Sequence, residues 1–232
     1  MTDMPPIVVL AGGLGTRLGP LTRNTPKSMV IVAGEPFIAH QLRLFMRQGI
    51  RHSVLCCGHY HEAILDFVGD GTAFGLKVEY SLDGEKLMGT GGALRRALPL
   101  LGDSFLVTYG DSYLDIAYPP IAEAFAASGK TGLMTVLHNE GRWDTSNVEL
   151  QGSRIMAYSK SPTPKMHHID YGLAVLNKAA FTNVPNDRPF DLSEIYQELI
   201  TRHDMTVFEV AKRFYEVGSP AGLAETEAYL RR

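Results

Sequence analysis

The order of apolar runs and helical patterns along the first half of the chain constrains its fold more than any other feature. Short apolar runs, typical of buried strands, alternate with segments whose apolar residues recur at helical spacing. Strands that alternate with helices in this way form a mostly parallel sheet with helices on both faces. The predicted strands span residues 7–11, 53–58, 76–81 and 104–110, and the predicted helices span residues 35–49, 61–69 and 91–101.

The second half of the chain departs from this alternation. Residues 147–159 predict a hairpin with Gly152 and Ser153 at its turn. Asp191 and Glu194 have the spacing of a capping box at the start of a helix. Further strands are predicted at 131–137, 171–177, 205–210 and 214–218, and further helices at 119–128, at 191–202 and at the C-terminus. The two halves together predict a Rossmann-like α/β fold with a mixed, mostly parallel central sheet flanked by helices.

Composition and charge disfavour several classes of protein. The 232 residues suffice for one large domain that needs no disulfide or metal to hold its core. A formal net charge of -3 disfavours a nucleic-acid-binding protein, because such domains are usually basic. No apolar run approaches the ~20 residues of a membrane span, and the N-terminus lacks the pattern of a signal peptide. Cys56 and Cys57 would point to opposite faces of a strand, so we interpret them as buried hydrophobic residues in a reducing cytoplasm.

A glycine-rich segment, LAGGLGTRLGPLTRNTPKSM over residues 10–29, follows the first predicted strand. Leu18 stands where a dinucleotide fingerprint has its third glycine, and Pro26 stands where a Walker loop has its second. Both patterns are therefore excluded, but a glycine-rich turn still lets backbone N–H groups approach a polyphosphate. Arg17 adds a planar guanidinium and Lys27 adds a compact ammonium to the same segment. The segment predicts a phosphate-binding loop rather than a tight turn whose cations face solvent.

This segment and the motifs after it resemble the sugar-1-phosphate nucleotidylyltransferases, also called sugar-nucleotide pyrophosphorylases. The segment is similar to the family's G-G-x-G-T-R-L loop and the Pro-Lys pair that follows it. Nearly the whole chain takes part in the resemblance, through an ordered set of motifs: LMGTGGALRRAL, VTYGDSYLD, YSKSP, HIDYGLAVL and FYEVGSPAGL. The resemblance implies a reaction in which a sugar 1-phosphate attacks the α-phosphorus of an NTP, giving an NDP-sugar and pyrophosphate.

The resemblance implies a role for each matching residue. Arg17, Lys27 and Asp111 would be catalytic, and Asp111 would bind Mg²⁺ together with Glu216. The residues expected to bind the nucleotide are Leu10, Ala11, Gly12, Gly13, Gly15, Thr16, Gly89 and Thr90. The residues expected to bind the sugar phosphate are Asn147, Lys160, Asp170 and Gly172.

Two positions depart from the family's pattern. Glu216 stands where the family usually has an aspartate, so its longer side chain requires either a backbone that is set back or metal binding through water. Ser159 replaces a glutamate that typically contacts sugar hydroxyls, which indicates that sugar recognition has been rebuilt. Asn147 and Asp170 are candidates for that rebuilding.

Within the family, the chain is most similar to the heptose-1-phosphate guanylyltransferases, which implies GTP and D-glycero-α-D-manno-heptose 1-phosphate as substrates. The alternatives are guanylyl transfer to mannose 1-phosphate, uridylyl transfer to an amino-sugar 1-phosphate, and cytidylyl transfer to a non-sugar phosphate or phosphonate. A different class, a nucleotide-binding regulatory subunit without activity, also stays open.

The resemblance further implies a single cytoplasmic domain, with a nucleotide-binding half over residues 1–115 and a sugar-phosphate-binding half over 116–232. We expect no C-terminal regulatory domain and no nucleic-acid or membrane partner, and we leave open whether the chain forms a homodimer.

Overall fold

Among the described residues, nine strands form one mixed sheet at the centre of the fold, which confirms the predicted fold class. The computed structural model describes residues 4–13, 19, 25–84, 86–182, 184 and 188–232. The strand order is β10-β9-β11-β6-β1-β4-β5, and β8 pairs with β11 and with β12. The strands are β1 (Ile7–Leu10), β4 (His52–Cys57), β5 (Lys77–Leu82), β6 (Ser104–Tyr109), β8 (Gly132–His138), β9 (Val148–Gln151), β10 (Arg154–Tyr158), β11 (His168–Asn177) and β12 (Met205–Val210).

The long strand β11 joins two parallel parts of this sheet. Strands β6, β1, β4 and β5 are parallel to one another, and β12 is parallel to β8. Because β11 runs antiparallel to both β6 and β8, it links these two parts into one sheet. Strands β9 and β10 form the predicted hairpin, with its turn at Gly152 and Ser153.

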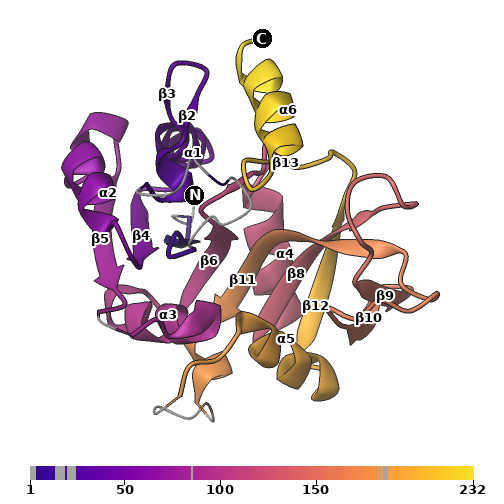
Figure 1. Ribbon diagram of the computed structural model, residues 1–232. Coiled ribbons are helices and arrows are strands. Elements are labelled where there is room, and N and C mark those ends of the chain that lie inside the picture. Colours follow the sequence, from indigo (N-terminus) through magenta and orange to yellow (C-terminus); the bar gives the residue numbers. More distant parts are fainter. Residues whose placement is uncertain (1–3, 14–18, 20–24, 85, 183, 185–187) are drawn as a thin grey trace.

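Helices cover both faces of the sheet (Figure 1). One core cluster receives side chains from α1 (Phe37–Arg47), α2 (His61–Val68) and α4 (Pro119–Ser128). The cluster on the opposite face receives side chains from α3 (Gly89–Ala97) and α5 (Leu192–Thr201). A smaller cluster packs α6 (Pro220–Leu230) against the hairpin of β2 (Ile31–Val32) and β3 (Glu35–Pro36) and against α1. Among the described residues, no helix is both long and apolar enough to cross a membrane.

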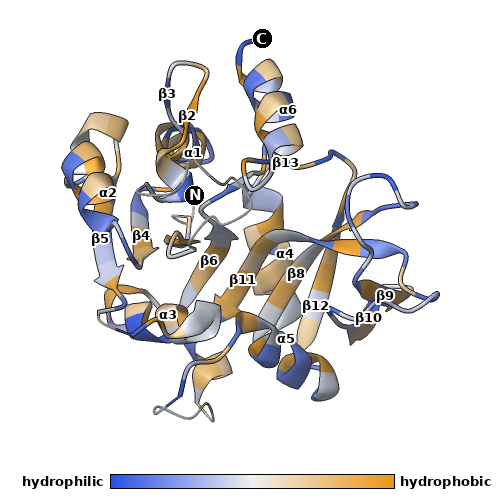
Figure 2. Cartoon of the chain, viewed as in Figure 1, coloured by the Kyte–Doolittle hydropathy of each residue, from blue (hydrophilic) through white to orange (hydrophobic). Residues whose placement is uncertain are grey.

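Alternation along the central strands divides the apolar side chains between the two faces. In β1, Val9 belongs to the cluster on the α1 side and Val8 to the cluster on the α3 side. Cys57 and Cys56 divide in the same way and both are buried, as predicted. Burial raises the pKa of both thiols, so they stay neutral and pack as small hydrophobic groups. Figure 2 shows strands β6, β8 and β12 of the sheet largely in the hydrophobic colour.

The boundaries of two predicted helices are set by identifiable residues. The predicted helix 91–101 begins earlier, at Gly89, and its α-helical part ends at Ala97, where a 3-10 turn takes over. Pro99 lies in that turn, and a proline lacks the N–H that an α-helix needs. Helix α5 begins at the predicted capping box, since the Asp191 side chain accepts from the Ser193 N–H and the Glu194 side chain accepts from the Asp191 N–H.

Two predicted strands differ from the observed ones. The predicted strand 171–177 begins at His168, because its first residues pair with β8 and β9. The predicted strand 214–218 is reduced to β13 (Tyr215–Glu216), which pairs with β7 (Ser112–Tyr113) in a separate two-stranded ladder. Both differences depend on partners that lie far away in the sequence.

The carboxyl ends of β1 and β6 approach each other closely at Gly110. A Cβ atom on Gly110 would lie 2.9 Å from the Cα of Ala11 and 3.1 Å from its Cβ, closer than packed atoms allow. We predict that Gly110→Ala lowers the free energy of unfolding by about 1–3 kcal/mol, the usual cost of overpacking a core. Urea denaturation measures this loss. Gly102→Ala is the control, because a Cβ there would meet only one atom, at 3.9 Å, and we expect its stability to equal that of the wild type.

Candidate active site

A cavity of about 500 Å³ lies beyond the carboxyl ends of β1, β4, β5 and β6, where ligands bind in open α/β sheets. We call it the first cavity. The predicted nucleotide-binding residues that line it are Leu10, Ala11, Gly12, Gly13, Gly89 and Thr90. The predicted residues Gly15, Thr16 and Arg17 lie outside the described residues. The structure thus brings the described part of the glycine segment and the first turn of α3 to one cavity.

The first turn of α3 is held by the segment that precedes α5. The Phe190 carbonyl accepts from the Gly91 N–H at 3.0 Å, and the Thr90 hydroxyl accepts from the Leu192 N–H at 2.9 Å. Gly89 has a φ of +73°, and a Cβ atom there would collide with the Phe190 carbonyl. This part of the first cavity is therefore shaped by residues about 100 positions away in the sequence.

Asp111 lies just after β6, and Lys27 reaches it from the end of the glycine segment. The Lys27 ammonium lies 2.9 Å from Oδ2 of Asp111, and both residues line the first cavity. The turn that carries Asp111 is fixed by Gln41 of α1, which is fully buried. The Gln41 amide donates to the carbonyls of Tyr109 at 2.9 Å and Ser112 at 2.7 Å. These bonds fix the backbone on both sides of Asp111.

The ladder between β7 and β13 places Glu216 beside Asp111. Glu216 pairs with Ser112, and the Val217 N–H donates to the Asp111 carbonyl at 2.8 Å. A Cβ atom built on Gly218 would lie 2.7 Å from Oε2 of Glu216, 3.2 Å from Oδ2 of Asp111 and 3.3 Å from Nζ of Lys27. The two carboxylates and the ammonium thus surround one point.

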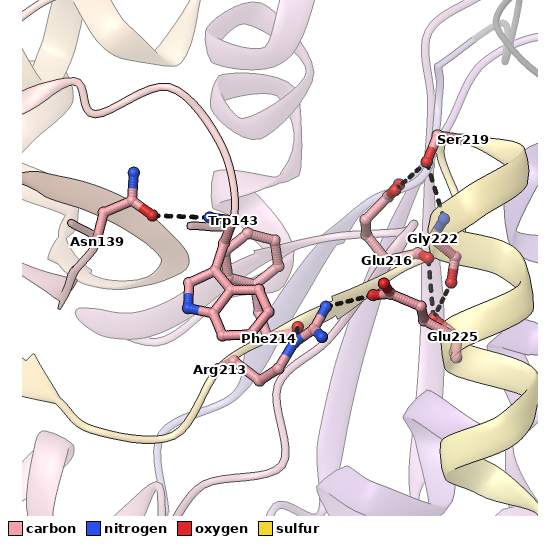
Figure 3. A network of polar contacts seen from close by, with 9 residues as sticks. Asn139, Trp143, Arg213, Phe214, Glu216, Ser219, Gly222 and Glu225 are labelled. Carbon is pink, nitrogen blue, oxygen red and sulfur yellow. Dashed lines mark hydrogen bonds and ion pairs between the residues drawn. The ribbon is translucent and has the colours of Figure 1, made fainter. Parts of the chain in front are cut away.

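The longer side chain of Glu216 is accommodated by the start of α6. Its carboxylate accepts from the Gly218 N–H and, at 2.5 Å, from the Ser219 hydroxyl (Figure 3). A carboxylate has about four lone-pair positions, so both oxygens keep room for a further partner. Among the described residues, no three His, Cys, Asp or Glu side chains gather as a ligand set. Two adjacent carboxylates fit Mg²⁺, which proteins often bind through one or two carboxylates together with substrate phosphates.

A second cavity, of about 430 Å³, adjoins the first, and the two share Tyr109 and Asp111. The other predicted residues that line this second cavity are Asn147, Asp170, Gly172 and Glu216. Lys160 is not among its lining residues. The Lys160 ammonium bonds instead to Oδ2 of Asp191 at 2.9 Å, and its side chain is 70% exposed. The structure therefore assembles the predicted sugar-phosphate residues except Lys160.

Asp170 is the centre of a polar network at the base of the second cavity. Its carboxylate accepts from the Gly172 N–H at 3.0 Å, and Tyr158 lines the same cavity. Its backbone N–H donates to the Asn147 side chain at 2.8 Å. Burial raises the pKa of Asp170 to about 6, since the charged form loses its hydration. The network offers both a carboxylate and fixed polar groups to a bound molecule.

A cation-π stack fixes the loop at the rim of the second cavity. The Arg213 guanidinium lies 4.0 Å from the Trp143 ring centroid and 4.7 Å from the Tyr215 ring centroid, and it bonds to Glu225 of α6 (Figure 3). The backbone N–H of Trp143 donates to Oδ1 of Asn139 at 3.0 Å. Trp143 lines the cavity and remains 42% exposed.

Sequence reasoning missed Asp83, Tyr109, Trp143 and Tyr158 as cavity-lining residues. Trp143 carried a usable signal, because it is the single tryptophan and stands in a polar loop. The others occupy positions near strand ends that resemble ordinary core or turn residues.

Comparison with known proteins agrees with this geometry. Residues 7–146, more than half of the chain, match the nucleotidyl transferase family, and the chain therefore belongs to that family. It is 27% identical to the D-glycero-α-D-manno-heptose 1-phosphate guanylyltransferase of Campylobacter jejuni, over 92% of this chain and 94% of that protein. It is 26% identical to the glucose-1-phosphate cytidylyltransferase of Salmonella typhi, over 87% of this chain and 86% of that protein.

A solved structure shows the same fold. It is a Bacillus anthracis protein provisionally assigned as a glucose-1-phosphate thymidylyltransferase, and it superimposes with a TM-score of 0.87 at 23% identity. The match covers 98% of this chain and 95% of that one. Proteins with this fold are thus named for different nucleotides. Specificity for the nucleotide base and for the acceptor must therefore be argued from individual residues and not from the fold.

The raised pKa of Asp170 predicts how the free energy of unfolding of the protein depends on pH. In the unfolded chain an aspartate titrates near pH 4, whereas folded Asp170 titrates at about 6, so the folded state loses stability as the pH rises between these values. We predict that Asp170→Asn, which cannot ionise, gains about 2–3 kcal/mol relative to the wild type between pH 4 and pH 7, since one pKa unit equals ~1.4 kcal/mol. Urea denaturation of both proteins across this range measures the difference. A difference that does not change with pH would contradict the prediction.

Proposed function

We propose that the protein transfers a nucleotidyl group from an NTP to a sugar 1-phosphate and releases pyrophosphate, with Mg²⁺ as cofactor. The favoured substrates are GTP and D-glycero-α-D-manno-heptose 1-phosphate. The observation that carries the proposal is the pair of adjoining cavities, which meet at Asp111 and Tyr109. A nucleotide in the first cavity and a sugar phosphate in the second would place their phosphates at this boundary.

The residues at the boundary suit an in-line displacement at phosphorus. An oxygen of the sugar phosphate attacks the α-phosphorus, the bond to the β-phosphate oxygen breaks, and pyrophosphate leaves. The attacking oxygen is already anionic, so no general base is needed, and catalysis requires mainly positioning and charge stabilisation. Lys27 lies within reach of this boundary and would donate to phosphate oxygens in exchange for Asp111. By its place in the glycine segment, Arg17 is proposed to add a second cation.

Asp111 and Glu216 would hold the Mg²⁺. When bound, the ion supplies positive charge to phosphate oxygens that would otherwise repel one another. Among the described residues, Lys27 faces two carboxylates at the boundary, so an added cation would offset their charge.

The second cavity supports a hydroxyl-rich acceptor. Asp170, Asn147 and Tyr158 offer hydrogen-bonding groups, and Trp143 offers an aromatic face at the rim. The named substrates follow from the similarity to the Campylobacter jejuni guanylyltransferase, which aligns over nearly the whole of both chains.

A pyrophosphate-release assay tests the proposal. It combines each of GTP, ATP, CTP and UTP with Mg²⁺ and with heptose, mannose, glucose and glucosamine 1-phosphates. Release of pyrophosphate with a matching NDP-sugar product is the expected outcome. No release with any pair would contradict the proposal and favour a nucleotide-binding protein without transfer activity.

Asp111 provides the first mutational prediction. We expect Asp111→Asn to lower kcat by at least about 10²-fold, the scale for losing one charge partner of a transition state. The fold should persist, because the backbone of this turn is held by Gln41. Steady-state kinetics and thermal melting measure the two effects. Asp103→Asn, an exposed aspartate next to the same strand, is the control and should retain wild-type activity.

Glu216 provides the second mutational prediction. We predict that Glu216→Gln raises the Mg²⁺ concentration needed for half-maximal activity, since an amide is a weaker ligand for a hard cation than a carboxylate. A metal titration at saturating substrates measures the shift. Glu62→Gln, at a side chain that is 71% exposed on α2, should leave the titration unchanged. An unchanged titration for Glu216→Gln would leave Asp111 as the only carboxylate ligand.

A further inference from the structure

Trp143 is a large aromatic side chain that is exposed and yet held in place. It lines the second cavity and is the single tryptophan of the chain. Its loop is fixed by Asn139, which is fully buried. Besides accepting from the backbone N–H of Trp143, the Asn139 amide donates to the Asp144 carbonyl at 2.5 Å and to the Ser146 hydroxyl at 3.0 Å. One buried amide thus fixes the backbone on which the indole stands.

The indole ring itself is fixed by Arg213. A guanidinium 4.0 Å from the ring centroid lies over the ring and covers one of its faces (Figure 3). Glu225 of α6 bonds to the same guanidinium and holds it there. A molecule in the second cavity would therefore meet the other face or the edge of the indole. Because the ring is already fixed, contact with it costs little conformational entropy.

The residues around Trp143 offer hydrogen-bond acceptors. Asp144 and Thr145 follow it in the loop and line the second cavity with it, and Asp170 lines the same cavity. Among the described residues that line this cavity, none is a lysine or an arginine. Carboxylates accept hydrogen bonds from hydroxyl groups. These walls suit a molecule with hydroxyl groups at its edge and an apolar face toward the indole.

A sugar ring has this distribution of groups, because its hydroxyls lie around the ring and its C–H bonds lie on the faces. The C–H face packs on an aromatic ring as other apolar groups do. A cationic group would also be attracted to an aromatic face. Here, however, Arg213 already places a positive charge over the Trp143 ring, and this charge repels a second cation. Trp143 therefore favours a neutral partner.

We propose that Trp143 determines acceptor specificity by stacking on the C–H face of the sugar ring, and that Arg213 is a positioning residue that fixes the indole and disfavours cationic acceptors. The inference rests on the proposed function, which assigns the second cavity to the sugar 1-phosphate. The phosphate would lie near Asp111, which both cavities share, whereas Trp143 lines the second cavity alone. Trp143 thus contacts the part of the acceptor that lies away from its phosphate.

Tryptophan fluorescence of the wild type tests the contact directly, since the emission of the single tryptophan reports Trp143 alone. The protein is titrated with heptose, mannose, glucose and glucosamine 1-phosphates and with phosphocholine. Each titration contains Mg²⁺ and either no nucleotide or the α,β-methylene analogue of GTP, ATP, CTP or UTP, which cannot release pyrophosphate. We expect the acceptor to cause a saturable shift of the emission to shorter wavelength, because the stacked ring loses contact with water. Phosphocholine, and each analogue by itself, should leave the emission unchanged.

Substitution of Trp143 should change acceptor binding and not the chemical step. We expect Trp143→Ala to raise the acceptor KM by at least about 10-fold and to keep kcat and the NTP KM within about 3-fold, because the stacking is equal in the ground state and the transition state. Trp143→Phe keeps an aromatic face and should stay within about 3-fold of the wild-type KM. Arg142→Ala, at a neighbouring side chain that is 65% exposed, is the control and should match the wild type.

Substitution of Arg213 tests its positioning role. Arg213→Met keeps most of the side-chain length and removes the charge. We expect it to raise the acceptor KM by about 3-fold or more and to lower the fluorescence anisotropy of Trp143 in the unliganded protein, because a freed ring must be ordered on binding. Arg213→Lys keeps a cation near the ring and should lie closer to the wild type in both measurements. Thermal melting shows whether each variant folds, and the wild-type fluorescence titration decides the stacking even if one does not.

The outcomes separate this inference from the proposed function. For a sugar 1-phosphate that supports pyrophosphate release, an unchanged Trp143 emission or an unchanged KM in Trp143→Ala would overturn the inference and leave the proposed function. A saturable emission shift with a sugar 1-phosphate and no pyrophosphate release would sustain the inference and contradict the proposed function. An equal shift with phosphocholine, or an unchanged anisotropy in Arg213→Met, would overturn the role of Arg213. No shift and no release with any compound would contradict both proposals.

Discussion

The candidate active site depends on the short ladder between β7 and β13. It pairs Ser112 with Glu216, so residues that are more than 100 positions apart in the sequence become neighbours. Through this ladder the end of β6, the start of α6 and Lys27 of the glycine segment meet around one point. The ladder contains only two residue pairs, and its stability therefore comes from what surrounds it: Gln41 below the turn and the apolar cluster that includes Tyr113 and Val217. The residues at the boundary between the two cavities keep their positions because the ladder, the Gln41 hydrogen bonds and this apolar cluster support one another.

Each cavity is also lined by a carboxylate, Asp83 in the first and Asp170 in the second. Among the described residues, Oδ1 of Asp83 has no hydrogen-bond partner, and burial raises the pKa of Asp170 to about 6. Both groups lower the stability of the protein without a ligand. They make the two cavities chemically distinct, because Asp83 lines the first cavity and Asp170 with its hydrogen-bonding neighbours lines the second.

Local patterns predicted most of the elements, because their causes lie within a few residues. The capping box of Asp191 and Glu194, the hairpin turn at Gly152 and the division of Cys56 and Cys57 between two faces all follow from short-range geometry. Predictions that needed a distant partner were less complete. The Lys160 ammonium forms an ion pair with Asp191 and does not line the second cavity. The predicted strand 214–218 is reduced to a ladder of two residue pairs. The predicted residues Gly15, Thr16 and Arg17 lie outside the described residues, so their roles stay predictions.

The sequence by itself determined the α/β alternation, the glycine-rich segment with its two cations, and the family, because each is written in consecutive residues or in an ordered set of motifs. Only the tertiary structure decided that Glu216 lies beside Asp111, that the Lys160 ammonium bonds to Asp191, and that Asp83 lines the first cavity. The physical reason is that hydrogen-bond satisfaction and burial are properties of contacts between distant segments. The sequence alone does not show whether the hydrogen-bond partners of an aspartate come from the chain or from a ligand.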